Sequence, residues 1–227
     1  MKLKKHPKNI VDVDSWFKAC PPKKGEKQWA DNRSAKELAK YMTKEFPFVP
    51  KEIEKSISLF ADKDFEFDWD AEYVTALPGV GEGRNHDAVL FGENIVITIE
   101  AKADETLGRL IEEELKQASD NKLFRINQLL DHLYIHSCDY QKLRYQLLTA
   151  SVGTILEAKK RECATAVLLV AVFKKNGHVS KEKLVANDED IKAFLNATQA
   201  HLVEGENGLY KIPNKTNIAL YFKKIVI

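Results

Sequence analysis

Cysteine is scarce in this sequence, and the three residues, Cys20, Cys138 and Cys163, form no C-x-x-C pair. This spacing argues against a zinc ribbon and a disulfide framework, and it is typical of a protein in a reducing cytoplasm. The basic start, residues 1–10, is followed by no apolar signal core, so secretion is disfavoured. The longest apolar run, Ala164 to Phe173, is about half as long as a bilayer-spanning helix. We therefore expect a cytoplasmic protein with no membrane association.

No charge of one sign dominates the chain. Its 227 residues include 35 Lys and Arg and 34 Asp and Glu, which gives a formal net charge of +1. This balance provides no global attraction to nucleic acid, so binding of DNA or RNA requires a local basic surface. Hydrophobic residues make up 44%, which is enough for a core and argues against disorder.

The first 33 residues show no clear periodicity. Lys and Pro are frequent there, and CPPKKGEKQW is the densest turn signal. We therefore predict an irregular N-terminal arm over 1–33, followed by one domain over 34–227.

The remaining sequence alternates between helix and strand patterns. Helices are predicted at 34–46, 51–60, 109–118, 122–135, 140–160 and 188–198. Strands are predicted within 65–77 and at 86–92, 95–103, 165–173, 208–213 and 217–227. The unbroken apolar run at 165–173 is typical of a strand buried on both faces. This order predicts an α/β fold with a mixed central sheet flanked by helices.

The strands at 86–92 and 95–103 are joined by the tight connection Gly92-Glu93-Asn94, which predicts a hairpin. Side chains alternate along a strand, so Glu100 and Lys102 share one face, and the apolar residues at 95, 97, 99 and 101 face the other way. Equal lengths of chain on the two sides of the turn make Asp87 an approximate cross-strand partner of Glu100. The hairpin therefore gathers two carboxylates and an ammonium.

Metal-dependent phosphodiester chemistry uses these residue types. Two neighbouring carboxylates repel each other unless a cation lies between them, and we therefore expect Glu100→Gln to leave folding intact or to improve it. Mg²⁺ prefers one or two carboxylates with water and phosphate oxygens, and it lowers the pKa of bound water. Lys102 can orient the attacking water or stabilise developing charge. Asp87 and Glu100 are thus predicted ligands of Mg²⁺ or Mn²⁺.

The stretch HDAVLFGENIVITIEAKADE resembles the motif of the PD-(D/E)XK phosphodiesterase superfamily, which has the restriction-endonuclease-like fold. His86-Asp87 stands where the superfamily has Pro-Asp, and Glu100-Ala101-Lys102 stands where it has (D/E)-x-K. The superfamily's core order, α-β-β-β-α-β, also matches the predicted elements from about Ser34 to Phe173. The resemblance implies a nuclease that acts on nucleic acid, most readily DNA, in a bacterial branch from which no activity can be carried over.

The resemblance suggests further residues for the same site. Many members carry a Glu on the helix before the sheet, which suggests Glu37 as a metal ligand, although Ser34 and Glu37 also have the spacing of a capping box. Glu72, on the first predicted strand, is another candidate for a third acid. In several branches a helix Gln after the Lys approaches the active site, which suggests Gln146, with a solvated helix face as the alternative. Arg84, in a Gly-rich loop predicted to be flexible, is placed to contact substrate.

Two other interpretations stay open. The fold can be retained as a catalytically inactive module that binds nucleic acid or a protein partner, and a surface strand bearing Asp, Glu and Lys is an ordinary feature. Assembly into a homodimer is a further open alternative. Metal-dependent cleavage separates the nuclease from the binding module.

Overall fold

The computed structural model describes residues 1–22, 25, 29–116, 118–136, 138–174 and 180–227. The strands are β1 (Lys2–Leu3), β2 (Glu66–Thr75), β3 (Arg84–Phe91), β4 (Ile95–Lys102), β5 (Thr165–Val172), β6 (His201–Leu202), β7 (Leu209–Ile212) and β8 (Ala219–Val226). The helices are α1 (Val13–Ala19), α2 (Ser34–Thr43), α3 (Lys51–Ile57), α4 (Ile111–Leu115), α5 (Asp120–His132), α6 (Tyr145–Lys160) and α7 (Lys181–Ala197), with a 3-10 helix at Cys138–Lys142. None of these described helices is long and apolar enough to cross a bilayer.

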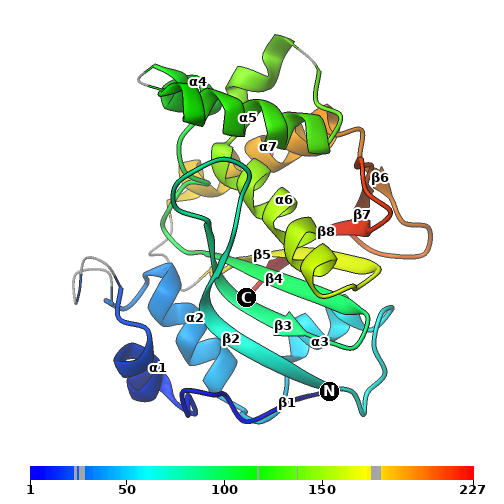
Figure 1. Cartoon of the computed structure of the whole chain (residues 1–227). Coiled ribbons are helices and arrows are strands. Elements are labelled where there is room, and N and C mark those ends of the chain that lie inside the picture. Colours follow the sequence, from blue (N-terminus) through cyan, green and yellow to red (C-terminus); the bar gives the residue numbers. More distant parts are fainter. Residues whose placement is uncertain (23–24, 26–28, 117, 137, 175–179) are drawn as a thin grey trace.

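In the described part of the chain, eight strands form one sheet in the order β1-β2-β3-β4-β5-β8-β7-β6. The pairs β1–β2, β4–β5 and β5–β8 are parallel, whereas β2–β3, β3–β4, β6–β7 and β7–β8 are antiparallel. Helices lie on both sides of this sheet (Figure 1), with α1, α2 and α3 on one side and α4, α5, α6 and α7 on the other. The predicted mixed α/β sheet flanked by helices is therefore confirmed.

Two hydrophobic clusters, one on each side of the sheet, form the core. The α2 face, covered by α1–α3, holds the side chains of Ile95, Ile97 and Ile99 from β4. The α6 face, covered by α4–α7, holds Val96, and the hydroxyl of Thr98 lies 2.6 Å from that of Thr154 on α6. The predicted alternation along β4 is confirmed, and both faces of the strand are buried.

The helix over 140–160 begins later than the sequence pattern predicts. Leu110 and Arg144 form an antiparallel bridge, with Tyr145 donating its backbone N–H to Arg109 at 3.0 Å. This pairing holds the backbone extended and delays α6 until Tyr145. The predicted helix at 109–118 is shortened to Ile111–Leu115 in the same way, and its residue 117 lies outside the described residues.

The N-terminal segment contains more structure than the predicted irregular arm. β1 extends the sheet by pairing with β2, and α1 starts at a capping box in which Asp12 and Ser15 bond each other's backbone N–H. Leu3, Ile10 and Trp16 are buried in the α2 face. Described residues of 1–33 therefore complete both sheet and core, while 23–24 and 26–28 of the predicted arm lie outside the described residues.

Candidate functional site

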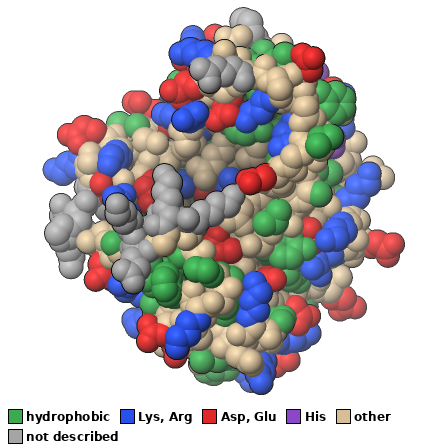
Figure 2. Space-filling model, turned by 60° about the vertical axis from the view of Figure 1, so that its left-hand side comes forward, with side chains coloured by type: hydrophobic (Ala, Val, Ile, Leu, Met, Phe, Trp, Pro, Cys, Tyr) green, Lys and Arg blue, Asp and Glu red, His purple; other side chains and the backbone are tan. Residues whose placement is uncertain are grey.

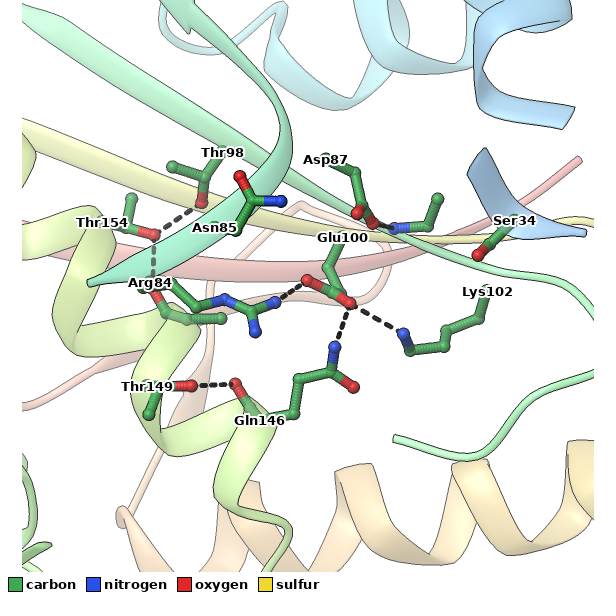
Figure 3. A network of polar contacts seen from close by, with 12 residues as sticks. Ser34, Arg84, Asn85, Asp87, Thr98, Glu100, Lys102, Gln146, Thr149 and Thr154 are labelled. Carbon is green, nitrogen blue, oxygen red and sulfur yellow. Dashed lines mark hydrogen bonds and ion pairs between the residues drawn. The ribbon is translucent and has the colours of Figure 1, made fainter. Parts of the chain in front are cut away.

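Glu100 is the centre of a polar network near the end of β4 (Figure 3), and it is only 2% exposed. Its Oε1 accepts hydrogen bonds from Lys102 Nζ at 2.7 Å and from Gln146 Nε2 at 2.5 Å. Its Oε2 accepts from Arg84 Nη2. The structure therefore brings Glu100, Lys102 and Gln146 together with Arg84, the first residue of β3, which the sequence suggested as a substrate contact.

Asp87 lies one step beyond the ladder between β3 and β4, whose final pair is Ala88 with Ile99. Continuing this register places Asp87 opposite Glu100, as the hairpin predicts. The Asp87 Oδ2 accepts a hydrogen bond from the backbone N–H of Ala101 at 2.7 Å. Figure 3 shows this carboxylate turned toward the main chain of β4, while Glu100 and its partners converge on the side of α6.

Glu72 occupies the next position in the same row, because Ala71 pairs with Ala88 and Tyr73 pairs with His86. Its carboxylate accepts a hydrogen bond from Asn85 Nδ2 at 2.5 Å. The backbone of Glu72 has a φ of 51°, which is rare for a residue other than glycine. Glu72 therefore lies on the strand beside Asp87, in an unusual conformation that is often found at functional sites.

At this row the alternation of side chains between the two faces of the sheet is interrupted on both β2 and β3, an interruption called here the exchange of faces. On β3, Ala88 belongs to the α2 face, whereas His86, two residues earlier, lies against Gly153 of α6. Side chains two residues apart in a regular strand share a face, so the alternation breaks between them. A Cβ at Gly153 would lie 3.0 Å from His86 Nε2 and 3.3 Å from Arg84 Cβ, so the glycine admits both residues to α6. The exchange thereby directs Arg84 toward Glu100.

Opposite shifts in pKa distinguish the two acids of the hairpin. Burial and the charge of Glu100 raise the pKa of Asp87 well above its ordinary value. Burial also raises the pKa of Glu100, but the charges of Arg84 and Lys102 outweigh it and leave that pKa lowered. Burial lowers the pKa of Lys102, but the charges of Glu100 and Asp87 outweigh it and leave that pKa raised. Glu100 is thus the compensated acid and Asp87 the uncompensated one.

Glu37 has a different setting from the one predicted. It is 3% exposed, and its carboxylate accepts hydrogen bonds from Asn32 N at 3.1 Å and from Lys40 Nζ at 2.9 Å. The capping box is absent, because Ser34 begins the helix itself and donates to Glu105 at 2.8 Å. Glu37 lines a cavity of about 520 Å³ together with Lys40. These contacts give no support to Glu37 as a ligand beside Glu100.

A family model described as a domain of unknown function (DUF6946) matches residues 9–226. The chain belongs to this family. No curated protein and no solved structure matches the chain. The DUF6946 match begins before α1 and extends through β8, so the part of the N-terminal segment from residue 9 onward, which includes α1, belongs to the shared unit. The family description assigns no activity.

The loop between β2 and β3 of this DUF6946 member is tied to α5, in contrast to the predicted flexible loop. The guanidinium of Arg125, a buried side chain, donates to the carbonyl oxygens of Pro78, Val80 and Glu82 at 2.9, 3.0 and 2.8 Å. Asn121 accepts from Val80 N at 2.8 Å. These bonds anchor the chain that leads into Arg84.

The face of the DUF6946 chain that Figure 2 shows mixes both signs of charge. Figure 2 shows Lys and Arg side chains interspersed with Asp and Glu. It also shows a hollow below the upper part of the molecule; α4 and α5 form this upper part in Figure 1. No single basic field covers this face. Recognition of a polyanion here would depend on individual cationic side chains.

The donor set fits a magnesium ion only in part. Among the described residues, no group of three or more His, Cys, Asp and Glu side chains is arranged to hold a metal ion. Mg²⁺ requires fewer, because it commonly binds one or two carboxylates and completes its shell with water and phosphate oxygens. Asp87 and Glu100 would supply two carboxylates, and the raised pKa of Asp87 shows that burial and Glu100 disfavour its charged form, which a bound cation would stabilise. The fit requires Arg84 to release Oε2 of Glu100.

Proposed function

We propose that this protein is a metal-dependent phosphodiesterase that hydrolyses nucleic acid, most readily DNA, and that its fold is restriction-endonuclease-like. One observation carries the proposal: Lys102 and Gln146 both donate to the same oxygen of Glu100, beside Asp87. Gln146 lies 46 residues beyond Glu100 in the chain. An ordinary charged surface strand gives no reason for a distant helix residue to reach the buried carboxylate that the sequence motif singles out.

The order of elements supports the same proposal. The helix α2 precedes the antiparallel strands β2, β3 and β4, and α6 then precedes β5, which runs parallel to β4. This is the α-β-β-β-α-β order that the resemblance implies. The strands β1 and β6–β8 and the helices α1, α3, α4, α5 and α7 lie outside these six elements.

The side chains have distinct tasks in this proposal. Asp87 and Glu100 would hold Mg²⁺ or Mn²⁺, which when bound polarises the phosphate and acidifies a water molecule. Lys102, held by Glu100 at 2.7 Å, brings a positive charge to where negative charge develops during hydrolysis. Gln146 orients the Glu100 carboxylate through its amide, so it acts as a positioning residue.

The ion pair between Arg84 and Glu100 favours a second candidate function. Both oxygens of Glu100 already have partners from the protein itself, so this carboxylate is satisfied with no metal. That arrangement suits a non-catalytic module that binds nucleic acid or a protein. The nuclease proposal requires the network to open, whereas the binding module does not.

A cleavage assay separates the two candidates. Single- and double-stranded DNA and RNA are incubated with the full chain in Mg²⁺, Mn²⁺ or a chelator, using wild type, Asp87→Asn and Lys102→Ala. Lys183→Ala is the matched control, because Lys183 pairs with Asp104 at 2.8 Å outside the network. We expect metal-dependent cleavage in wild type and control only. Salt-sensitive binding with no cleavage indicates the binding module. If the protein neither cleaves nor binds nucleic acid, the nuclease proposal is overturned, and so is the nucleic-acid-binding module.

A further inference from the structure

Arg84 makes one charged contact in the site and leaves another donor unmet. Its Nη2 donates to Glu100 Oε2, while its Nε is buried with no partner among the described residues. Its side chain is 13% exposed, against 6% for that of Lys102. An unmet buried donor makes this position of the guanidinium less favourable than a fully bonded one. Arg84 is thus the more accessible and less completely satisfied of the two cations on Glu100.

The position of Arg84 decides whether Glu100 can bind a metal ion. Oε1 of Glu100 is occupied by Lys102 and Gln146, and Arg84 is the partner of Oε2. A divalent cation on Oε2 would occupy the place of the guanidinium and repel its charge. Metal binding through Oε2 and the Arg84–Glu100 contact therefore compete with each other.

A phosphate offers this guanidinium a better partner than Glu100 does. The planar fork of an arginine can donate two parallel N–H bonds to phosphate oxygens, including one from Nε. Arg84 also lies where the anchored β2–β3 loop enters the site, next to the exposed residue Asn85. A polyanion arriving at this edge would meet Arg84 before the more deeply buried Lys102.

We propose that Arg84 is a phosphate-binding residue that controls access of the divalent cation to Glu100. In the free protein it neutralises Glu100; a phosphate of bound nucleic acid draws it away and opens Oε2 to the cation. This inference rests on the proposed nuclease function. It requires positive coupling between nucleic acid and metal, which is reciprocal because each ligand favours the same open arrangement.

Calorimetric titration of Mn²⁺ into the full chain tests the coupling without relying on turnover. Wild type, Arg84→Gln and Arg161→Gln are titrated with and without a short phosphorothioate DNA duplex that resists cleavage. Arg161→Gln is the matched control, since Arg161 also pairs with a buried glutamate of α6, Glu157, at 2.8 Å. We expect the duplex to tighten Mn²⁺ binding by about tenfold in wild type and control, within the usual range of coupling.

Arg84→Gln should behave differently in two respects. Without duplex, we expect it to bind Mn²⁺ about tenfold more tightly than wild type, because Oε2 is already open; with duplex, no further gain is expected. It should also bind the duplex more weakly in the absence of metal. Arg84→Lys, which keeps the charge and is the safer variant for folding, should lose part of the coupling, because an ammonium lacks the planar fork.

The possible failures are distinguishable. If wild type cleaves nucleic acid but both Arg84 variants retain wild-type Mn²⁺ affinity and coupling, the control by Arg84 is wrong and the nuclease proposal stands. If wild type neither binds Mn²⁺ nor cleaves, while Arg84→Gln likewise binds none, the nuclease proposal fails and the control by Arg84 fails with it. Melting transitions of each variant establish that the titrated protein is folded.

Discussion

The carboxylate of Asp87 accepts a hydrogen bond from the backbone N–H of Ala101 at 2.7 Å, one step beyond the last pair of the β3–β4 ladder. In a regular antiparallel pair a backbone carbonyl accepts such a bond. Here a side chain accepts it, so the two strands can diverge while the buried N–H stays satisfied. One residue therefore ends the ladder and supplies an acid beside Glu100.

Asp87→Asn should stabilise the metal-free protein, because asparagine keeps the acceptor for Ala101 and removes the charge. Burial and Glu100 raise the pKa of Asp87, so the folded state binds its proton more tightly than the unfolded chain does. Stability from this group is present at low pH and lost as pH rises from about 3.9, the unfolded pKa, through the raised value. Urea unfolding with and without Mg²⁺ measures the effect.

At neutral pH we expect a higher urea midpoint for Asp87→Asn than for wild type without metal, and a smaller gain when Mg²⁺ is added. At acidic pH, where Asp87 is protonated, the two midpoints should approach each other. A lower midpoint for the variant at neutral pH would show that the charged carboxylate is a structural partner.

His86 should make the protein sensitive to acid. Burial and the charge of Arg84 lower its pKa to about 3, and neither ring nitrogen has a partner among the described residues. An unfolded histidine titrates near about 6.5, so the folded state binds fewer protons and loses stability as pH falls from there toward 3. We expect His86→Leu to make this decline shallower by up to about 1.4 kcal/mol per pH unit.

The free energy of unfolding, measured by urea titration across the acidic range, checks this prediction. His201→Leu is the control, because His201 is exposed on the edge strand β6. Parallel pH profiles for wild type and His86→Leu would show that His86 takes no part in the acid sensitivity.

Local patterns were sufficient to predict the hairpin and its register. Strict alternation along 95–103 and the short turn at Gly92 fixed which residues of β4 face α6 and brought Asp87 opposite Glu100. The apolar run at 165–173 likewise predicted β5, which is buried on both faces. These features depend on neighbours along the chain, which a single sequence displays.

Features that depend on distant parts of the chain were not predictable in the same way. The pairing of Arg84 with Glu100 depends on the exchange of faces, and a sequence pattern of strict alternation does not predict such an interruption. The positive φ of Glu72 beside it is equally hidden, because glutamate is not a residue type that indicates this conformation. The short strand β1 carries too little pattern to identify, and it forms because β2 offers an edge. The lack of a capping box at Ser34 follows from Glu105, which lies 71 residues away.

Glu100→Gln should destabilise the protein, which reverses the expectation drawn from the sequence. Repulsion between the acids is outweighed, because Arg84 and Lys102 lower the pKa of Glu100. Removing one partner of a buried ion pair leaves a charge uncompensated and costs about 3–5 kcal/mol. Urea unfolding at neutral pH should show a loss of this size.

The pH dependence provides a check on the cause. Stability from a group with a lowered pKa is present above its unfolded value, about 4.3 for Glu, and is lost as pH falls through the folded value. The difference between wild type and Glu100→Gln should therefore narrow in acid. If the variant is as stable as wild type at neutral pH, Arg84 and Lys102 do not offset the repulsion between Glu100 and Asp87, and the expectation drawn from the sequence is correct.

Lys102→Ala should lower cleavage per folded molecule by about 10²–10³-fold, the usual cost of a lost transition-state contact. Metal binding should persist, because an ammonium cannot ligate a cation. Lys102→Arg should also lower the cleavage rate substantially, since the planar guanidinium of arginine does not replace a compact ammonium held 2.7 Å from Glu100. Cleavage rates and Mg²⁺ titrations are measured on the same folded fraction, with Lys183→Ala as control. If Lys102 only neutralises Glu100, alanine would destabilise the fold and leave turnover per folded molecule at the wild-type value, which would remove Lys102 from the proposed chemistry.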